Sequence, residues 1–336
     1  MKAIAYRQSL PISDLASLQD VDLPIPVLAP RDLLVRVHAI SVNPIDTKVR
    51  LGIAPKDGEC KVLGWDAVGV VEAIGSVVSH FCVGDRVYYA GAINRAGANS
   101  ELHAVDERIV AKAPGSLNDA QAAALPLTSI TAYELLFERL AVPKNGGAGQ
   151  TLLIVGGAGG VGSILIQLAR QLTQLRVIAT ASRPDTKQWC LDLGAHAVID
   201  HSQPLSEGLK ALNIECVDTV ASLTQTPQHF TQIVASLKPQ GRLGVIDDMA
   251  KVDIMLLKPR SISLHWESMF TRSTFQTPDM EQQGLLLAEV TALVDAGKIR
   301  TTVNANFGNI NATNLRRAHA LIESGKSQGK IVLEGF

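Results

Sequence analysis

A cluster of glycines between two apolar segments is the feature of the sequence that most directly suggests chemistry. An apolar run at 152–155 leads straight into the glycines, and apolar residues at helical spacing follow from Ile164 onward. This order predicts a buried strand, a glycine turn and a helix. Gly157, Gly159 and Gly162 fit the pattern G-x-G-x-x-G, whose glycines let the backbone approach a pyrophosphate at the helix N-terminus.

The surrounding sequence separates this motif from an ordinary glycine-rich turn. A second strand-like run, RVIATA at 176–181, follows the predicted helix and completes a β-α-β unit. We therefore predict that the turn binds a dinucleotide. The backbone expected around its phosphates is that of Gly157, Ala158, Gly159, Gly160, Val161 and Gly162.

The end of the second strand indicates which dinucleotide is bound. NAD requires an acidic residue there for its ribose hydroxyls, whereas the extra phosphate of NADP fits a small residue beside an arginine. The sequence has Ser182 and Arg183, with Lys187 shortly after, which favours NADPH. Asp185 follows Pro184 and is interpreted as a first-turn residue of the next helix. The alternative for Arg183 and Lys187 is a solvated surface pair.

Composition limits the class of protein. The chain has 336 residues, of which 46% are hydrophobic and 19% charged, so it can bury a large core and is expected to form two domains. A net charge of −1 gives no reason to expect a nucleic acid partner. No apolar run is long enough to cross a membrane, and no signal peptide is recognisable. Four scattered cysteines suit a reduced compartment, so the cytoplasm is the expected location.

The pattern of predicted elements gives a domain layout. Short strand-like runs dominate residues 1–124, β-α-β alternation dominates 125–266, and 267–336 are expected to return to the first domain. We predict an α/β protein with a doubly wound parallel sheet, a second β-rich domain of barrel or sandwich type, and a site in the cleft between the domains. The run Ser261–His265 is expected to form an edge of the parallel sheet, which suggests a homodimer.

Several passages resemble the medium-chain dehydrogenase/reductase superfamily, and within it the quinone oxidoreductase-like branch. The resemblance covers essentially the whole chain and is closest to the zinc-type alcohol dehydrogenase-like group. It implies a Rossmann domain together with a β-rich GroES-like barrel domain. The passages are VNPIDTKVRLG (42–52), VLGWDAVGVVEAIGSVV (62–78), VGDRVYYAG (83–91), AALPLTSITAYELL (123–136), LGAHAVIDH (193–201) and GKIVLEGF (329–336).

The positions that hold zinc in that superfamily differ here. Zinc alcohol dehydrogenases use a cysteine in a Cys-x-x-Asp turn, a histidine in a Gly-His-Glu turn and a further cysteine. The matching residues in this sequence are Asn43, Trp65 and Leu127, none of which is a Cys, His or carboxylate ligand. We therefore predict no catalytic zinc. Without a metal, the suitable acceptors are quinones and α,β-unsaturated carbonyls, because conjugation delocalises the charge that hydride transfer delivers.

The resemblance also implies roles for individual residues. It places Asn43 and Thr131 near the nicotinamide and its ribose, and Ile246 and Asp247 along the nicotinamide end. Ser182, Arg183, Lys187 and His201 would surround the adenosine-side phosphate, and Lys330 would reach the cofactor from the C-terminal segment. Asp46 and Tyr89 are candidates for moving a proton. Purely structural roles remain open for Asn43, Asp46, Tyr89, Thr131 and His201.

The sequence leaves three functional hypotheses. The first is a zinc-independent oxidoreductase that transfers hydride from NADPH to a quinone or an enone. The second is a zinc-containing alcohol dehydrogenase, against which the missing ligands argue. The third is a non-catalytic NADPH-binding redox sensor, which the fold alone does not distinguish from an enzyme.

Overall fold

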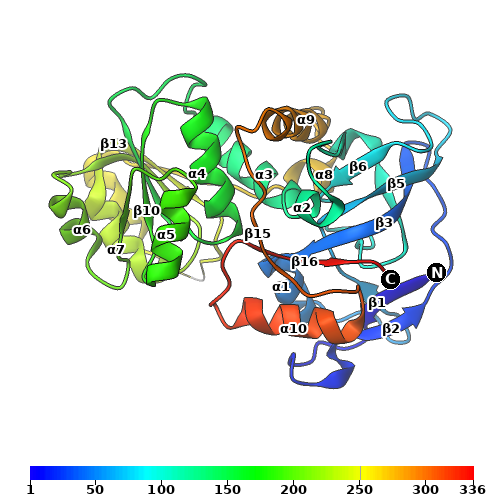
Figure 1. Ribbon diagram of the computed structural model, residues 1–336. Helices are drawn as coiled ribbons and strands as arrows, with labels where there is room; N and C mark the ends of the chain where they lie inside the picture. The colour runs from blue at the N-terminus through cyan, green and yellow to red at the C-terminus, as the bar shows by residue number, and fades with distance from the viewer. Residues whose placement is uncertain (250) are drawn as a thin grey trace. The chain divides into compact units, whose positions relative to one another are not determined.

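The chain folds into two compact units. Figure 1 shows the computed structural model, which describes residues 1–249 and 251–336. One unit, here called the β-rich unit, contains residues 1–130 and 270–336. The other, here called the parallel-sheet unit, contains residues 131–269. No helix of the described residues is both long and apolar enough to cross a membrane.

The β-rich unit is built on a sheet in which two distant parts of the chain meet. Its strand order is β15-β16-β3-β5-β6-β8, with β7 also paired to β3, and a smaller sheet has the order β2-β1-β4. The strands are β1 (Lys2–Tyr6), β2 (Gln19–Asp22), β3 (Asp32–Val42), β4 (Lys61–Val62), β5 (Ala67–Ile74), β6 (Arg86–Tyr89), β7 (Leu102–Asp106), β8 (Val110–Lys112), β15 (Val303–Asn306) and β16 (Lys330–Glu334).

Strand β3 is the centre of this unit. Its first half pairs with β7 and its last four residues pair with β16, while β5 runs along the other edge. From Leu33 to Ala39 buried side chains alternate with the less buried Leu34, Arg36 and His38, as expected of a half-buried strand. From Ala39 to Val42, where β16 pairs with β3, every side chain is buried.

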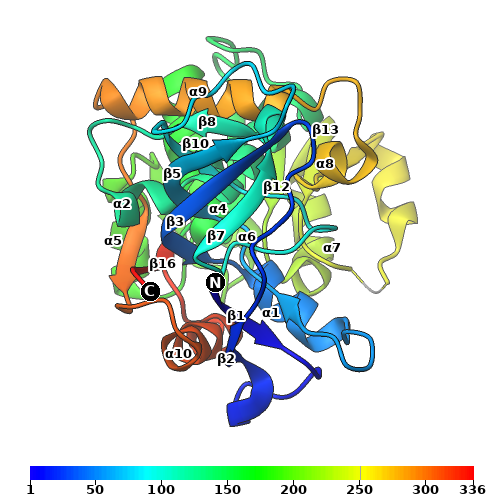
Figure 2. The same ribbon diagram turned by 90° about the vertical axis from the view of Figure 1, so that its right-hand side faces the viewer.

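Helices cover the β-rich sheet on several sides. Figure 2 shows α9 beside β8 and α10 beside α1. The helical segments of the unit are η1 (Leu15–Ser17), α1 (Pro44–Gly52), η2 (Glu107–Ile109), α2 (Asp119–Ala123), α8 (Thr271–Phe275), α9 (Gln282–Asp295) and α10 (Ala312–Glu323). The apolar-rich run at 280–296 contains α9.

The parallel-sheet unit has the strand order β11-β10-β9-β12-β13-β14, and every pair in it is parallel. The chain moves outward from β9 in one direction and then returns to continue in the other, so the predicted doubly wound sheet is confirmed. The strands are β9 (Thr151–Val155), β10 (Arg176–Thr180), β11 (Ala197–Ile199), β12 (Val217–Ser222), β13 (Leu237–Val245) and β14 (Ser263–Trp266).

Helices connect these strands, as right-handed crossovers require. Figure 1 shows α4 and α5 on one side of the sheet and α6 and α7 on the other. The apolar faces of α6 and α7 form a core with the strands that includes Leu153, Val220 and Phe230. The segments are η3 (Glu134–Arg139), α4 (Gly160–Leu172), α5 (Pro184–Asp192), α6 (Leu205–Ala211), α7 (Thr226–Ser236) and η4 (Ile254–Arg260).

The boundaries between the two units lie a few residues later in the chain than expected. The expected boundaries followed residues 124 and 266, whereas the compact units divide after residues 130 and 269. Helix α3 (Pro126–Tyr133) explains the first difference, because the boundary falls within a continuous helix. Pro126 opens this helix, a position where its missing N–H costs nothing.

Candidate active site

The predicted glycine turn connects β9 to α4. Gly159 is the N-cap of α4, and the turn contains Gly157, Ala158, Gly159, Gly160, Val161 and Gly162. Two hydrogen bonds hold it to the end of β10: Gly157 N donates to Thr180 O at 3.1 Å, and Gly156 N donates to Thr180 Oγ1 at 3.0 Å. The free N–H groups of the first turn of α4 therefore begin directly at the glycine motif, where an anion would be stabilised.

The three motif glycines meet different surroundings. A Cβ on Gly162 would lie 2.5 Å from the carbonyl oxygens of both Gly156 and Gly157, and a Cβ on Gly157 would lie 2.7 Å from Ala179 Cβ. A Cβ on Gly159 would be an ordinary 3.7 Å from Gly156 O. Gly157 and Gly162 are thus required by the protein's own packing, whereas Gly159 leaves open space for a ligand.

Charged residues gather beyond the end of β10. Arg183 caps α5 and its Nε lies 3.5 Å from Asp185 Oδ1, while Lys187 Nζ lies 2.9 Å from Asp200 Oδ2. The pKa of Asp200 is lowered to about 2 by hydrogen bonds from Ser202 and Lys187. His201 Nδ1 lies 3.1 Å from Thr180 Oγ1. The predicted phosphate-side residues therefore come together in the parallel-sheet unit, each cation already facing a carboxylate.

Four other predicted residues also lie in the parallel-sheet unit. Ser182 follows β10 and Ile246 follows β13, and both are partly exposed. Asp247 accepts a hydrogen bond from Thr226 N at 3.0 Å and so stabilises the start of α7. Thr131 is buried in α3.

The β-rich unit contains a buried polar cluster made of Ser41, Asn43, Asp46, Asp66 and Lys330. Strand register explains why its members meet. Ile331 pairs with Val42 in the antiparallel β16–β3 ladder, so Lys330 lies beside Asn43, the residue that follows Val42. All five side chains are almost completely buried. Residues separated by almost the whole chain thus form one group.

Lys330 and Asp66 form the centre of this cluster. Lys330 Nζ donates to Asp66 Oδ2 and to Val42 O, each at 3.0 Å, and also to Asn43 Oδ1. These bonds use all three N–H donors of the ammonium group. Asp66 Oδ2 further accepts from Ser41 Oγ and Asn43 Nδ2 at 2.7 Å, and its Oδ1 accepts from Leu127 N at 2.7 Å. Lys330 therefore fixes the orientation of the Asn43 amide.

Asp46 connects helix α1 to this cluster. Its Oδ2 accepts from Asn43 N at 2.7 Å and its Oδ1 from Gly64 N at 3.0 Å. Burial raises the pKa of Asp46 to about 7, although these hydrogen bonds and the charge of Lys330 act in the opposite direction. The geometry is that of a helix-capping residue, since Asp46 accepts from the backbone N–H of the N-cap residue Asn43.

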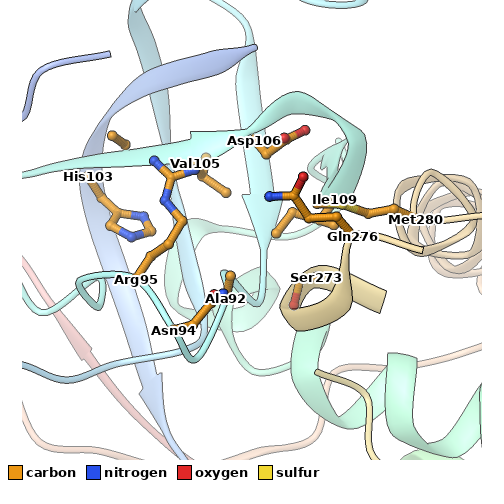
Figure 3. A pocket seen from close by; sticks show the side chains of 11 residues that line it. Ala92, Asn94, Arg95, His103, Val105, Asp106, Ile109, Ser273, Gln276 and Met280 are labelled. Atoms are coloured by element: carbon orange, nitrogen blue, oxygen red, sulfur yellow. The ribbon is translucent and has the colours of Figure 1, made fainter. Parts of the chain in front are cut away.

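Tyr89 makes its hydrogen bond away from the polar cluster. Its hydroxyl lies 3.0 Å from His103 Nδ1 and the two rings stack at an interplanar angle of 18°. Burial raises the pKa of Tyr89. His103 also lines a small cavity of about 100 Å³, which Figure 3 shows with Arg95 and Gln276 on opposite sides. The guanidinium of Arg95 is paired with Asp32, so this cavity offers no uncompensated charge.

The donor atoms at the superfamily's zinc positions do not fit a metal. Asn43 Oδ1 is occupied by Lys330, Trp65 Nε1 donates to Ala92 O at 3.3 Å, and Leu127 contributes only its backbone N–H to Asp66. Among residues 1–249 and 251–336, no group of three or more His, Cys, Asp or Glu side chains is placed to hold a metal ion. An indole and an aliphatic side chain cannot ligate zinc.

Comparisons with known proteins identify the family to which the chain belongs. Residues 29–116 match the alcohol dehydrogenase GroES-like domain, and residues 193–333 match the zinc-binding dehydrogenase family. The chain is 39% identical to a zinc-type alcohol dehydrogenase-like protein of Staphylococcus epidermidis over 99% of both chains. It belongs to the medium-chain dehydrogenase/reductase superfamily. The predicted GroES-like domain is thereby confirmed, and the protein is an oxidoreductase of this superfamily.

Two solved structures of this superfamily are similar over nearly their whole length. A putative zinc-dependent alcohol dehydrogenase from Rhizobium etli is 54% identical with a TM-score of 0.96, covering 100% of this chain and 98% of that one. Escherichia coli quinone oxidoreductase, solved in complex with NADPH, is 26% identical with a TM-score of 0.85, covering 99% and 100%. The names of these relatives thus point to both zinc-dependent and quinone-reducing proteins.

Sequence reasoning singled out three of the five cluster members, Asn43, Asp46 and Lys330. It did not single out Ser41 or Asp66. The signal was present in part, because an acidic residue after Gly64-Trp65 stands where the superfamily has its Gly-His-Glu turn. Its partner Lys330 lies 264 residues away, and only the strand register reveals the pairing.

The glycine turn gives a prediction with a matched control. Gly159→Ala should leave the free energy of unfolding nearly unchanged. It should weaken the binding of a nicotinamide dinucleotide, with NADPH as the probe, tenfold or more, because the new methyl group fills the space left for a phosphate. Gly162→Ala should instead destabilise the protein by about 1–3 kcal/mol through overpacking. Urea unfolding and fluorescence titration of NADPH measure the two effects. Loss of stability in Gly159→Ala with unchanged NADPH affinity would contradict this division of roles.

Asp46 gives a prediction about pH. The pKa of Asp46 is near 7 in the folded protein, above the usual value near 3.9. Between pH 3.9 and 7, the folded protein therefore keeps a proton on Asp46 that the unfolded chain has lost. This contribution to stability is present at low pH and disappears as the pH rises to 7. The stability of the wild type relative to Asp46→Asn should fall by about 2 kcal/mol from pH 5 to 7. Denaturant titrations across this range measure it, and a relative stability that rises with pH would contradict the raised pKa.

Proposed function

We propose that the protein is a zinc-independent oxidoreductase that transfers hydride from NADPH to a quinone or an α,β-unsaturated carbonyl compound. The observation that carries this proposal is the bonding of Asn43. This residue stands at the first zinc-ligand position of the superfamily, and its side-chain oxygen accepts from Lys330 while its amide donates to Asp66. A side chain held in this way supports a fixed hydrogen-bonding role rather than metal coordination.

The chemistry of the acceptor follows from this substitution. NADPH, when bound, supplies the hydride. A simple ketone would need a metal or a strong donor to stabilise the alkoxide that forms, whereas a conjugated acceptor spreads this charge over its own π-system. The proton that completes the reduction of a quinone can come from water. The residues of this chain are then needed to bind, orient and exclude solvent rather than to polarise a carbonyl.

Within the β-rich unit, we propose that Asn43 contacts the nicotinamide. Lys330 occupies its Oδ1 and Asp66 accepts from one of its N–H groups, so one N–H remains to be offered to a ligand. Asp46 is a positioning residue in this proposal, because it holds the backbone N–H of Asn43. Thr131 is proposed to contact the nicotinamide ribose. We propose no proton transfer by Tyr89, whose hydroxyl is committed to His103.

The choice of NADPH rests on the residues after β10. Ser182 is small, Arg183 caps α5, and Lys187 lies on the first turns of the same helix. No acidic residue follows directly after β10, where NAD-binding proteins have one. The NADPH complex of the related Escherichia coli quinone oxidoreductase supports the same choice.

We further propose that the protein is a cytoplasmic homodimer. Strand β14 forms one edge of the parallel sheet, and Trp266 at its end is 54% exposed. An open strand edge with a large exposed aromatic side chain is suited to pairing with a second copy of the chain.

The decisive test is NADPH consumption by chelator-treated protein with an ortho-quinone and an enal as acceptors. We expect turnover to survive chelation within about twofold. We also expect kcat/KM to be about tenfold or more higher with NADPH than with NADH, since a charged hydrogen bond contributes about 1.5–3 kcal/mol.

Two outcomes would contradict the proposal in different ways. Activity that returns only when zinc is added would indicate a zinc alcohol dehydrogenase. Tight NADPH binding without turnover of either acceptor would indicate a non-catalytic redox sensor. The untreated protein assayed with NADPH alone, without an acceptor, provides the background rate.

A further inference from the structure

Two histidines lie side by side at the edge of the parallel sheet where the glycine turn also lies. His201 follows β11 and His229 belongs to the first turns of α7, and their ring centroids are 6.0 Å apart. The carboxyl ends of parallel strands share one edge, so both residues lie on the ligand-binding side of a doubly wound sheet. His201 is connected to the glycine turn through Thr180, whose Oγ1 contacts His201 Nδ1 and accepts from Gly156 N.

The charges around this histidine pair are balanced without the histidines. Arg183 faces Asp185, and Lys187 faces Asp200. A phosphate dianion that binds between Arg183 and Lys187 therefore adds negative charge to surroundings that already contain two carboxylates. Additional positive charge is needed to offset it, because like charges close together are strongly unfavourable.

The histidines are able to supply this charge. Burial lowers the pKa of His201, with further lowering by His229, Lys187 and Arg183 and an opposing effect of Asp200. Burial also lowers the pKa of His229. Both rings are therefore largely neutral at pH 7 before a ligand binds. His229 Nδ1 is buried and has no hydrogen-bond partner among the described residues.

Charged groups on the other elements packed against α7 are engaged elsewhere or lie at the surface. Asp218 pairs with Lys238, Arg260 donates to carbonyl oxygens at the end of α7 and the start of β13, and Arg242 donates to the carbonyl oxygens of Leu140 and Ala141. The exposed ones are Glu207, Lys210 and Lys258. The charges that act on His201 are thus those of Lys187, Arg183 and Asp200. The carboxylate of Asp247 lies at the start of α7, where it accepts from Thr226 N at 3.0 Å.

We propose that His201 and His229 make the phosphate site of the parallel-sheet unit proton-linked, so that the pair takes up one proton when the 2′-phosphate of NADPH binds. The dianion favours the imidazolium form, which in turn adds a cation to the phosphate site. NADH lacks this phosphate and binds without taking up the proton. This inference rests on the proposed use of NADPH and adds a pH-dependent control of cofactor choice.

The sign and size of the effect follow from proton linkage. The proton is bound only in the complex, so NADPH affinity is highest at lower pH and falls as the pH rises. One proton taken up corresponds to at most a tenfold loss of affinity per pH unit. The 2′-phosphate itself loses its second proton near pH 6, so it is almost entirely a dianion above pH 7. Between pH 7 and 8, we expect the Kd of NADPH to rise about three- to tenfold and that of NADH to stay within twofold.

Isothermal titration calorimetry of the full-length protein tests the proposal. NADPH and NADH are titrated at pH 7 and 8, each in two buffers of different ionisation enthalpy, which counts the protons taken up. The variants are His201→Gln and His229→Gln. The matched control is His265→Gln on β14, the outermost strand on the side of the sheet away from β11. In the wild type, log Kd should change more steeply with pH for NADPH than for NADH. His201→Gln and His229→Gln should each lose most of this difference, whereas His265→Gln should retain it.

Three results would overturn the proposal. The first is that the wild type takes up the same number of protons with NADPH as with NADH. This result would overturn the proposal even if His229→Gln failed to fold. A pH slope retained in a folded His229→Gln variant would do so as well. An NADPH Kd no lower than that of NADH at pH 7 would overturn the proposed cofactor choice and this inference together, whereas the first two results leave NADPH preference intact.

Discussion

The buried ion pair between Lys330 and Asp66 is the interaction on which the candidate site depends. Its two side chains are 3% and 0% exposed, so neither charge is compensated by water. Removing one partner of such a pair usually costs about 3–5 kcal/mol, because the other charge is left buried and alone. The pair also binds Ser41, Asn43 and the backbone of Leu127. The C-terminal strand β16 is thereby tied to β3, to the turn before β5 and to the start of α3.

The charge balance of this cluster explains the behaviour of Asp46. Two buried carboxylates, Asp46 and Asp66, share one ammonium group. Asp66 is bonded directly to Lys330, whereas Asp46 is held by backbone N–H groups. A protonated Asp46 leaves the cluster neutral, and burial and the nearby Asp66 favour that state. The cluster is therefore complete in its charges and hydrogen bonds without a metal ion. This completeness is what links the geometry to the proposed metal-free reduction of a conjugated acceptor.

Local signals predicted much of the parallel-sheet unit. The glycine motif, the strand before it and the helix after it occupy consecutive residues, so their periodicity was enough to place β9, the turn and α4. The residues after β10 followed from a fixed spacing in the same β-α-β unit. In contrast, the role of His229 depends on α7 returning from β12 to the sheet edge that carries His201, which no spacing in the sequence indicates.

The β-rich unit was less predictable for the same reason. The zinc positions were compared correctly as single residues, but the partner of Asn43 comes from the last strand of the chain. The resemblance implied a role for Lys330 at the cofactor, but it did not indicate the hydrogen bonds from Lys330 to Val42, Asn43 and Asp66. Antiparallel register between β3 and β16 produces this arrangement, and a one-residue shift would turn Lys330 to the other face.

Thermal unfolding with and without zinc shows whether this cluster is complete without a metal. A ligand that binds only the folded state raises its stability by RT ln(1 + [L]/Kd), which is about 2.7 kcal/mol at a hundredfold excess over Kd. For chelator-treated protein, we expect the same Tm within about 1 °C whether or not micromolar zinc is added. A rise in Tm of several degrees with zinc that disappears in Asn43→Ala would contradict this expectation.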